Sequence, residues 1–239
     1  MGTSLGFKVL NFFTMNIIKE KAFSGGIGPI DCLETSNILA MTGGGLYPYF
    51  PTNKLIIWDD EKEKIKAEIT LKSEINAVKF KYEYLFVVVD FKIYIYSIFE
   101  NLNLKMEVMT LYNPKGLIET NAIDDPCLFA HLVYTDNNEE NEEEGKISIY
   151  NLNDDTKVPL TAHTTLIKCM KFNYKGNFFA TASTKGTLIR IFDTSNGSLL
   201  KELRRGIEST VIYSLDFDYF DNWLVCITKT GTLHVWCLK

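Results

Sequence analysis

One short pattern occurs twice near the end of this chain: ATASTKGTLIRIF at residues 180–192 and CITKTGTLHVW at residues 226–236. Each copy leads from a small or β-branched apolar stretch, through a turn that contains Gly186 or Gly231, into a second apolar stretch. Turn residues between two short hydrophobic runs are typical of antiparallel strands joined by a hairpin. The repeat therefore predicts two homologous β-units.

Between the two copies lies the segment KELRRG, residues 201–206. It places two adjacent arginines, Arg204 and Arg205, on the seam between the units. Arginine binds phosphate through two parallel hydrogen bonds, and hydroxyl groups supply further ones. With one arginine facing each way, the seam predicts two anion sites side by side.

The same kind of unit recurs outward along the chain. Short β-branched or aromatic runs, which end at or near an aromatic residue, occur at residues 54–60, 91–96, 146–151, 188–193 and 233–236. Their intervals of roughly 36 to 54 residues lie near the ~40–45 of WD-type propeller blades. Long helical periodicity is absent. The predicted fold class is all-β, a WD-type β-propeller.

The turn signals divide the chain into blades. We expect full blades at residues 30–71, 73–111, 116–162 and 163–203, a half-blade that ends near Phe23, and an incomplete blade from Ile207 to Lys239. Residues 1–239 would form a single propeller domain of about four full and two partial blades. Seven blades need about 280 residues, so the ring is expected to be incomplete. The acidic segment from Asn137 to Gly145 is expected to be a solvated loop.

Composition narrows the function classes. Hydrophobic residues make up 46% of the chain, which allows a substantial core. The net charge of −5 argues against general nucleic-acid binding. Six acidic residues lie within residues 136–144; without them the net charge is +1, so the rest of the surface could approach an anionic membrane.

Other bulk features point to a cytoplasmic protein. No apolar run approaches ~20 residues, so we expect no transmembrane segment, and no signal peptide is visible. The five cysteines are odd in number and form no CxxC pair, which is typical of a reduced protein with buried thiols. We expect no metal site and no cofactor.

Several motifs resemble the PROPPINs, β-propellers that bind polyphosphoinositides, and within them the WIPI-type autophagy proteins. The resemblance covers essentially the whole chain. It is strongest over residues 180–206, where Leu203 replaces the usual Phe of a Phe-Arg-Arg-Gly motif. The other matching segments are residues 6–9, 43–45, 51–60 and 112–117.

The resemblance implies binding of phosphatidylinositol 3-phosphate and phosphatidylinositol 3,5-bisphosphate in two pockets beside the arginine pair. The internal repeat supports the assignment, since Ser183 matches Thr228, Thr187 matches Thr232, and Arg190 matches His234. The first pocket would use Arg204, His163, Ser183, Thr187 and Arg190. The second would use Arg205, Ser214, Thr228, Thr232 and His234.

The family also implies a peripheral location on autophagosomal, endosomal or vacuolar-type membranes and an autophagy lipid-transfer protein as partner. Asn53, Asp59 and Asp60 are the candidates for the partner face. A family propeller has seven blades, so the first strands of blade 1, the end of blade 6 and blade 7 would be missing here. The family's membrane-inserting loop would follow Lys239.

Two other functions stay open on the sequence alone. A WD-type protein scaffold without lipid specificity would need only its protein-binding faces. A propeller enzyme would need carboxylates, histidines or metal ligands in its central channel. No HExxH sequence or nucleophile elbow occurs, and His131, His163 and His234 are far apart in sequence, so we expect no catalysis.

Overall fold

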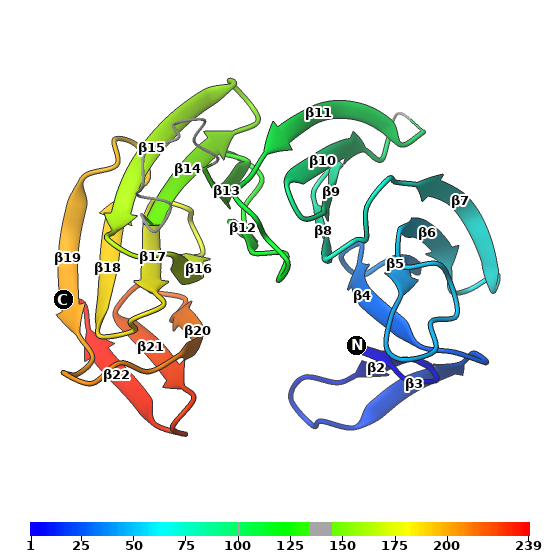
Figure 1. Cartoon of the computed structure of the whole chain (residues 1–239), viewed down its shortest axis with the longest axis horizontal. Coiled ribbons are helices and arrows are strands. Elements are labelled where there is room, and N and C mark those ends of the chain that lie inside the picture. The colour runs from blue at the N-terminus through cyan, green and yellow to red at the C-terminus, as the bar shows by residue number, and fades with distance from the viewer. Residues whose placement is uncertain (100, 134–144) are drawn as a thin grey trace. The chain divides into compact units, whose positions relative to one another are not determined.

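The computed structural model describes residues 1–99, 101–133 and 145–239. Within these residues the chain forms strands and no helix, and the strands build six antiparallel sheets (Figure 1). The sheets belong to two compact units, Met1–Gly116 and Leu117–Lys239. That residues 1–239 form a single domain remains a prediction.

The first unit contains three sheets, each a meander of strands adjacent in sequence. The first sheet comprises β1 (Gly2–Thr3), β2 (Gly6–Leu10) and β3 (Ile17–Ala22). The second comprises β4 (Ile27–Cys32), β5 (Ile38–Gly43), β6 (Lys54–Asp59) and β7 (Lys64–Thr70). The third comprises β8 (Ala77–Lys81), β9 (Tyr84–Val88), β10 (Lys92–Ser97) and β11 (Asn103–Met109).

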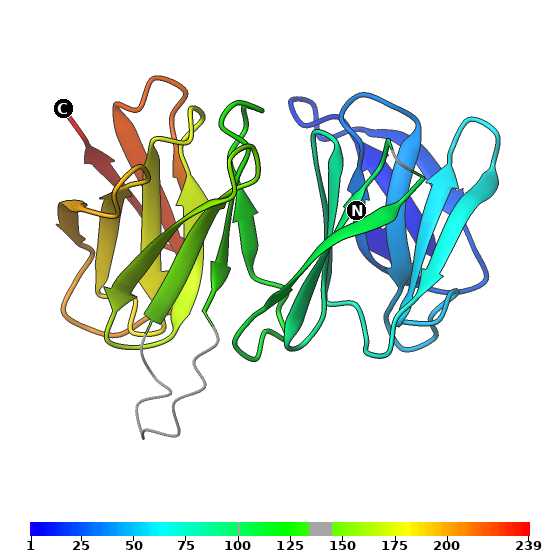
Figure 2. The same ribbon diagram turned by 90° about the horizontal axis from the view of Figure 1, so that it is seen from above.

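The second unit repeats this arrangement in its described residues. The fourth sheet comprises β12 (Ile118–Thr120), β13 (Leu128–Leu132), β14 (Gly145–Asn151) and β15 (Thr156–His163). The fifth comprises β16 (Ile167–Phe172), β17 (Phe178–Ser183), β18 (Leu188–Asp193) and β19 (Leu199–Arg204). The sixth comprises β20 (Ile212–Phe217), β21 (Trp223–Thr228) and β22 (Leu233–Cys237). Figure 2 shows the strands of each sheet twisted against their neighbours, as chirality requires.

The sequence prediction of four full and two partial blades is confirmed in the described residues by four four-stranded and two three-stranded sheets. Some boundaries were misplaced: β4 begins at Ile27 rather than Ile30, β19 ends at Arg204 rather than Leu203, and His163 ends β15 of the fourth sheet instead of beginning the next one. Of the predicted acidic loop, residues 137–144 lie outside the described residues, and Gly145 begins β14.

Burial follows the position of each strand within its sheet. The middle strands β5 and β6 are buried along nearly their whole length, because neighbouring layers cover both of their faces. The outer strand β7 alternates between exposed and half-buried positions. The sequence of β5, ILAMTG, is therefore continuously apolar or small, as a strand covered on both faces requires. The sequence of β7, KIKAEIT, alternates between polar and apolar residues because one of its faces is exposed.

The core of the second unit positions the candidate site. Ala182 and Ile189 from the fifth sheet pack against Ile212, Leu215 and Cys226 from the sixth, in one buried cluster. Leu203 lies at the edge of the same cluster, as expected of a packing residue. This contact fixes one face of the fifth sheet against the sixth, so alternate residues of β17, β18 and β19 point to the opposite face.

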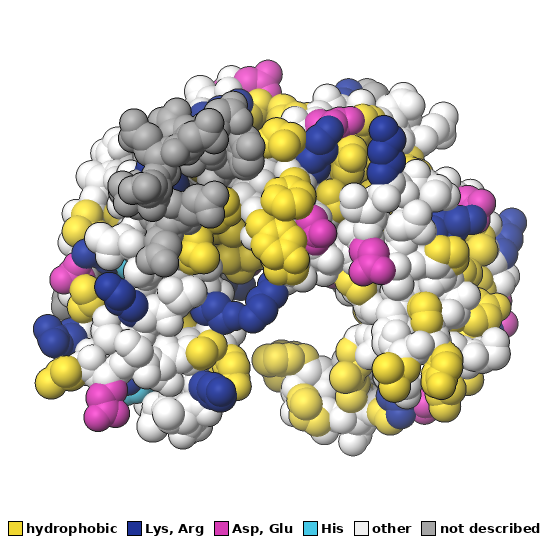
Figure 3. Space-filling model, viewed as in Figure 1, with side chains coloured by type: hydrophobic (Ala, Val, Ile, Leu, Met, Phe, Trp, Pro, Cys, Tyr) yellow, Lys and Arg dark blue, Asp and Glu magenta, His cyan; other side chains and the backbone are white. Residues whose placement is uncertain are grey.

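Exposed hydrophobic side chains gather on the first unit. In Figure 3 they cover the area where Figure 1 draws the β2–β3 hairpin and the β5–β6 loop. Phe13 at the first tip is 92% exposed and Leu46 at the second is 94% exposed. Across the described residues, we find no helix with the length and apolar character that a membrane crossing needs.

Candidate functional site

The two arginines leave the end of β19 in different directions. Arg204 is paired with Leu188, and its exposed side chain has no hydrogen bond or ion pair within the described residues. It lies on the face of the fifth sheet opposite to Leu203, which packs toward the sixth. The Arg204 guanidinium is thus available to a ligand on the side of the fourth sheet.

Arg205 turns toward the sixth sheet. Its guanidinium donates to the carbonyl of Gly186, with an Nε–O distance of 2.9 Å, and to the carbonyl of Glu208. Its backbone N–H donates to the carbonyl of Thr187 at 2.9 Å. Burial raises the pKa of the Cys226 thiol to about 11, and the nearby Arg205 charge opposes that rise. The two arginines therefore lie toward different neighbouring sheets, and that each belongs to an anion site remains a prediction.

Arg190 carries a balanced charge. The strand register places it opposite Thr181 on one side and Glu202 on the other. Its Nε lies 2.8 Å from Oε2 of Glu202, and its Nη1 lies 2.8 Å from the carbonyl oxygen of Ala162 in β15. Arg190 shares a face with Arg204, but the bond to Ala162 joins the fifth sheet to the fourth, and the ion pair with Glu202 neutralises its charge.

His163 reaches the same face from the preceding sheet. Its ring is 5% exposed, and its Nε2 lies 3.0 Å from the hydroxyl oxygen of Thr181. Burial, together with the Arg190 charge, lowers the pKa of His163 from 6.5 to about 4. The imidazole is neutral at pH 7 and contributes hydrogen bonding but no positive charge.

The two hydroxyl residues of the first group lie on the β17–β18 turn. Ser183 is 5% exposed and Thr187 is half-buried. Gly186 between them has a φ of +59°, and a Cβ there would lie 1.9 Å from the backbone oxygen of Thr210. Only glycine fits this turn, so its conformation is fixed and both hydroxyls are held near the start of β18.

The second group is a linked set of hydroxyls. The Oγ1 atom of Thr228 lies 2.6 Å from that of Thr232 and 2.8 Å from that of Thr230. Thr232 Oγ1 lies 3.2 Å from Nε2 of His234, whose ring stacks on Trp236. Sequence reasoning missed Thr230; its signal was the alternation Thr-x-Thr-Gly-Thr across the turn.

The repeat also holds in three dimensions. Arg190 lies opposite Thr181, and His234 lies opposite Cys226, which is the counterpart of Thr181. If the two copies are instead aligned on Gly186 and Gly231 without a gap, Arg190 matches Val235. Arg190 corresponds to His234 because the second hairpin has one residue fewer between its two paired positions than the first.

The structure does not bring Ser214 to the second group. A bulge between Ile212 and Ser214 places Ile212 opposite Thr228 and Ser214 opposite Ile227. Thr228 and Ile227 are adjacent in β21, so their side chains point to opposite faces. The exposed Ser214 therefore lies on the face of the sixth sheet that is turned away from Arg205.

The three residues predicted for a partner face support the second sheet. Asn53 donates from Nδ2 to the carbonyl of Leu71 at 2.8 Å. Asp59 is 2% exposed and accepts hydrogen bonds from Asn37 and from the backbone of Lys62, and these contacts lower its pKa even though burial opposes them. The Asp60 carboxylate forms an ion pair with Lys19 at 2.8 Å. Of the two carboxylates, that of Asp60 is more accessible than that of Asp59.

Both groups consist of hydroxyl and imidazole side chains, and the sequence predicts one arginine beside each. Such an arrangement recognises phosphate oxygens. A search of the described residues for clustered histidines, cysteines and carboxylates finds no group that could hold a metal ion. His131 is buried, with Nδ1 2.9 Å from the carbonyl oxygen of Leu132, and burial lowers its pKa.

Comparison with known proteins gives consistent results. The PROPPIN family model matches residues 53–239. Autophagy-related protein 18e of Arabidopsis thaliana is 34% identical over 100% of this chain and 62% of its own length. SVP1-like protein 2 of Schizosaccharomyces pombe is 31% identical over 98% of this chain and 62% of its own length. The chain spans between 52% and 64% of the curated relatives that it matches.

Solved structures agree on the fold. The structure of Kluyveromyces lactis Hsv2p matches with a TM-score of 0.81 at 26% identity. The match covers 99% of this chain and 70% of the Hsv2p chain. The complex of KlAtg21 with the coiled-coil of AgAtg16 has a TM-score of 0.82 at 21% identity, over 97% of this chain and 74% of that one. The sheets described above are thus blades of a β-propeller.

Proposed function

This chain belongs to the PROPPIN family, and from that premise we propose that it is a phosphoinositide-binding scaffold recruited to membranes. The observation that carries the proposal is the division of the arginine pair, with one guanidinium on each side of β19. We expect each to act with the hydroxyls of one copy of the internal repeat. The headgroups bound would be those of phosphatidylinositol 3-phosphate and phosphatidylinositol 3,5-bisphosphate.

In the first pocket Arg204 supplies the positive charge. Ser183, Thr187 and neutral His163 supply hydrogen bonds, whereas Arg190 orients the pocket through its bonds to Glu202 and Ala162. A guanidinium without a protein partner pairs with phosphate at little cost, because no existing bond has to break. This supports Arg204 as the principal contact.

In the second pocket the hydroxyls of Thr228, Thr230 and Thr232 lie next to His234. Arg205 approaches from β19. Two weak headgroup sites on one molecule raise the effective concentration of the second site, so avidity can exceed either affinity by ~10²–10⁴. A bivalent contact of this kind suits a protein that must bind membranes reversibly.

The cellular role follows from the relatives. We propose that the protein acts in autophagy or endosomal traffic, peripherally on autophagosomal, endosomal or vacuolar-type membranes, without catalysis and without a cofactor. An autophagy-related relative and a relative in complex with an Atg16 coiled-coil support a protein partner from that machinery. A lipid-transfer protein is the partner we propose, with Asn53, Asp59 and Asp60 near its binding face.

The test is titration of the chain with soluble dibutanoyl phosphatidylinositol 3-phosphate, followed by liposome flotation with the same headgroup. We expect two binding sites in the wild type, one each in Arg204→Thr and Arg205→Thr, and none in the double variant. Lys201→Thr removes the same charge from the same strand and is expected to keep both sites. Absence of headgroup binding in the wild type would favour the alternative, a WD-repeat protein scaffold without lipid specificity.

A further inference from the structure

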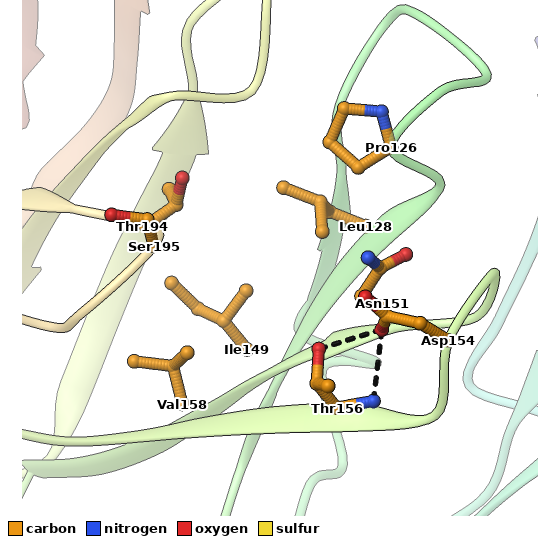
Figure 4. Close-up of a pocket in the computed structure, with 9 residues that line it drawn as sticks. All are labelled: Pro126, Leu128, Ile149, Asn151, Asp154, Thr156, Val158, Thr194 and Ser195. Carbon is orange, nitrogen blue, oxygen red and sulfur yellow. Dashed lines mark hydrogen bonds between the residues drawn. The ribbon is translucent and has the colours of Figure 1, made fainter.

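A pocket of about 270 Å³ lies in the second unit, between the fourth sheet and the β18–β19 turn (Figure 4). Its floor is formed by Leu128, Ile149 and Val158, and its rim includes Asp154 and Ser195. Neither candidate phosphate group uses any of these residues.

The floor is apolar because of strand register. Ile149 is paired with Val158, so both side chains point to one face of the fourth sheet. At Gly197 the β18–β19 turn packs against the fourth sheet, since a Cβ on this residue would lie 2.8 Å from Cδ2 of Leu160. The turn contacts the sheet at Gly197 and separates from it toward Ser195, and the space between is the pocket.

The rim carries uncompensated negative charge. The Asp154 carboxylate accepts two hydrogen bonds from Thr156, at 3.0 Å and 2.6 Å, which lower its pKa. Within the described residues the Asp154 carboxylate has no ion-pair partner.

Neighbouring residues add to the negative charge at the rim of the pocket. Asp125 directly precedes Pro126, which lines the pocket, and Asn153 donates to the Asp125 carboxylate at 3.2 Å. The nearest lysine in sequence, Lys157, lies over the ring of Tyr150 on the other face of the sheet. The opening is therefore acidic above an apolar floor.

We infer that this pocket binds a lysine or arginine side chain from a basic segment of a partner protein. The aliphatic stem of such a side chain can lie on Val158 and Ile149 while its charged end meets Asp154, since these side chains are amphipathic along their length. Charge complementarity of this kind selects partners by sign. An anionic bilayer would be repelled from this face, so the occupant is a protein segment.

The test uses blocked pentapeptides with glycine on both sides of a central lysine, arginine or norleucine, the last an uncharged analogue of lysine. Methyl resonances of Leu128, Ile149 and Val158 are followed by NMR in the full chain. We expect the cationic peptides to shift these methyls with affinities of about 1–10 mM. The norleucine peptide is expected to bind about twofold to fivefold more weakly, and high salt should abolish the difference.

Two variants locate the charge. Asp154→Asn is expected to weaken lysine binding about twofold to fivefold, because it keeps the hydrogen bonds to Thr156 but not the charge. Asp155→Asn makes the same change one residue away, where the carboxylate accepts from Tyr150 on the opposite face, and should have no effect. Ser195→Trp should block the opening and abolish the methyl shifts.

Equal binding of lysine and norleucine peptides, equal effects of the two Asp variants, or no methyl shift at about 10 mM peptide would each overturn the inference. The amide spectrum of each variant checks that it is folded. Binding of dibutanoyl phosphatidylinositol 3-phosphate is measured in parallel and should be unchanged in all three variants. The pocket and the proposed lipid sites can thus fail independently.

Discussion

Acidification from pH 7.5 to pH 5 is expected to destabilise residues 117–239 through His163. The folded protein holds this imidazole neutral, with a pKa of about 4, because it is buried and next to Arg190. In the unfolded chain its pKa is about 6.5. The unfolded state therefore binds more protons below pH 6.5, and the free energy of unfolding falls as the pH falls.

The size of the effect follows from the two pKa values. At pH 5 the unfolded imidazole is almost fully protonated and the folded one is mostly neutral, so the loss is about 2 kcal/mol. The loss in the free energy of unfolding increases further down to pH 4 and reaches its full size below that value. The ring is 5% exposed, so solvent screening removes little of this amount.

Urea unfolding of the wild type and of His163→Gln at both pH values measures the loss. Glutamine can still donate to the Thr181 hydroxyl but does not titrate near neutral pH, so the variant should lose about 2 kcal/mol less than the wild type on acidification. NMR titration of the His163 ring gives its pKa directly. A pKa near 6.5, or equal acid sensitivity of the two proteins, would refute the reasoning.

Three further predictions concern the same unit. Gly186→Ala should destabilise the protein by about 1–3 kcal/mol or more, because a Cβ would meet the Thr210 backbone, whereas Gly231→Ala, with φ +78° and open space, should cost less; thermal melting compares them. Thr228→Val should cost about 1 kcal/mol by chemical denaturation, since it removes a buried hydroxyl from a hydrogen-bonded set. Glu202→Gln should release Arg190 and tighten headgroup binding at the first pocket, measured by titration.

The architecture was predictable because its signals are local. Runs such as KLIIWD at residues 54–59 and the repeated Gly-Thr turn specify strands and hairpins without reference to the rest of the chain. Their spacing then gives the number of sheets. The blade boundaries were less predictable, most clearly at His163, where a strand continues past a sequence that is equally compatible with the start of the next unit.

The site residues were harder to predict because their roles depend on register. Arg190 carries no free charge, since Glu202 lies directly opposite it in β19, and eleven intervening residues conceal that pairing from the sequence. Ser214 would share a face with Ile212 in a regular strand, but one bulge reverses it. Such pairings arise from tertiary packing and have no local sequence signal.

The two candidate pockets are chemically alike but differ in how far their donors are already engaged. The guanidinium of Arg205 donates to two backbone carbonyls, and Thr228 and Thr232 bond each other, so a phosphate entering there must replace existing bonds. Arg204 has no such partner within the described residues.

Because only the surplus over broken contacts appears as affinity, the pocket of Arg204 should bind a headgroup more tightly than the pocket of Arg205. Titration of the single variants tests this: Arg204→Thr should leave the weaker site and Arg205→Thr the stronger one. The reverse order would mean that the second group is preorganised by its internal bonds, and that the lack of partners at Arg204 confers no advantage.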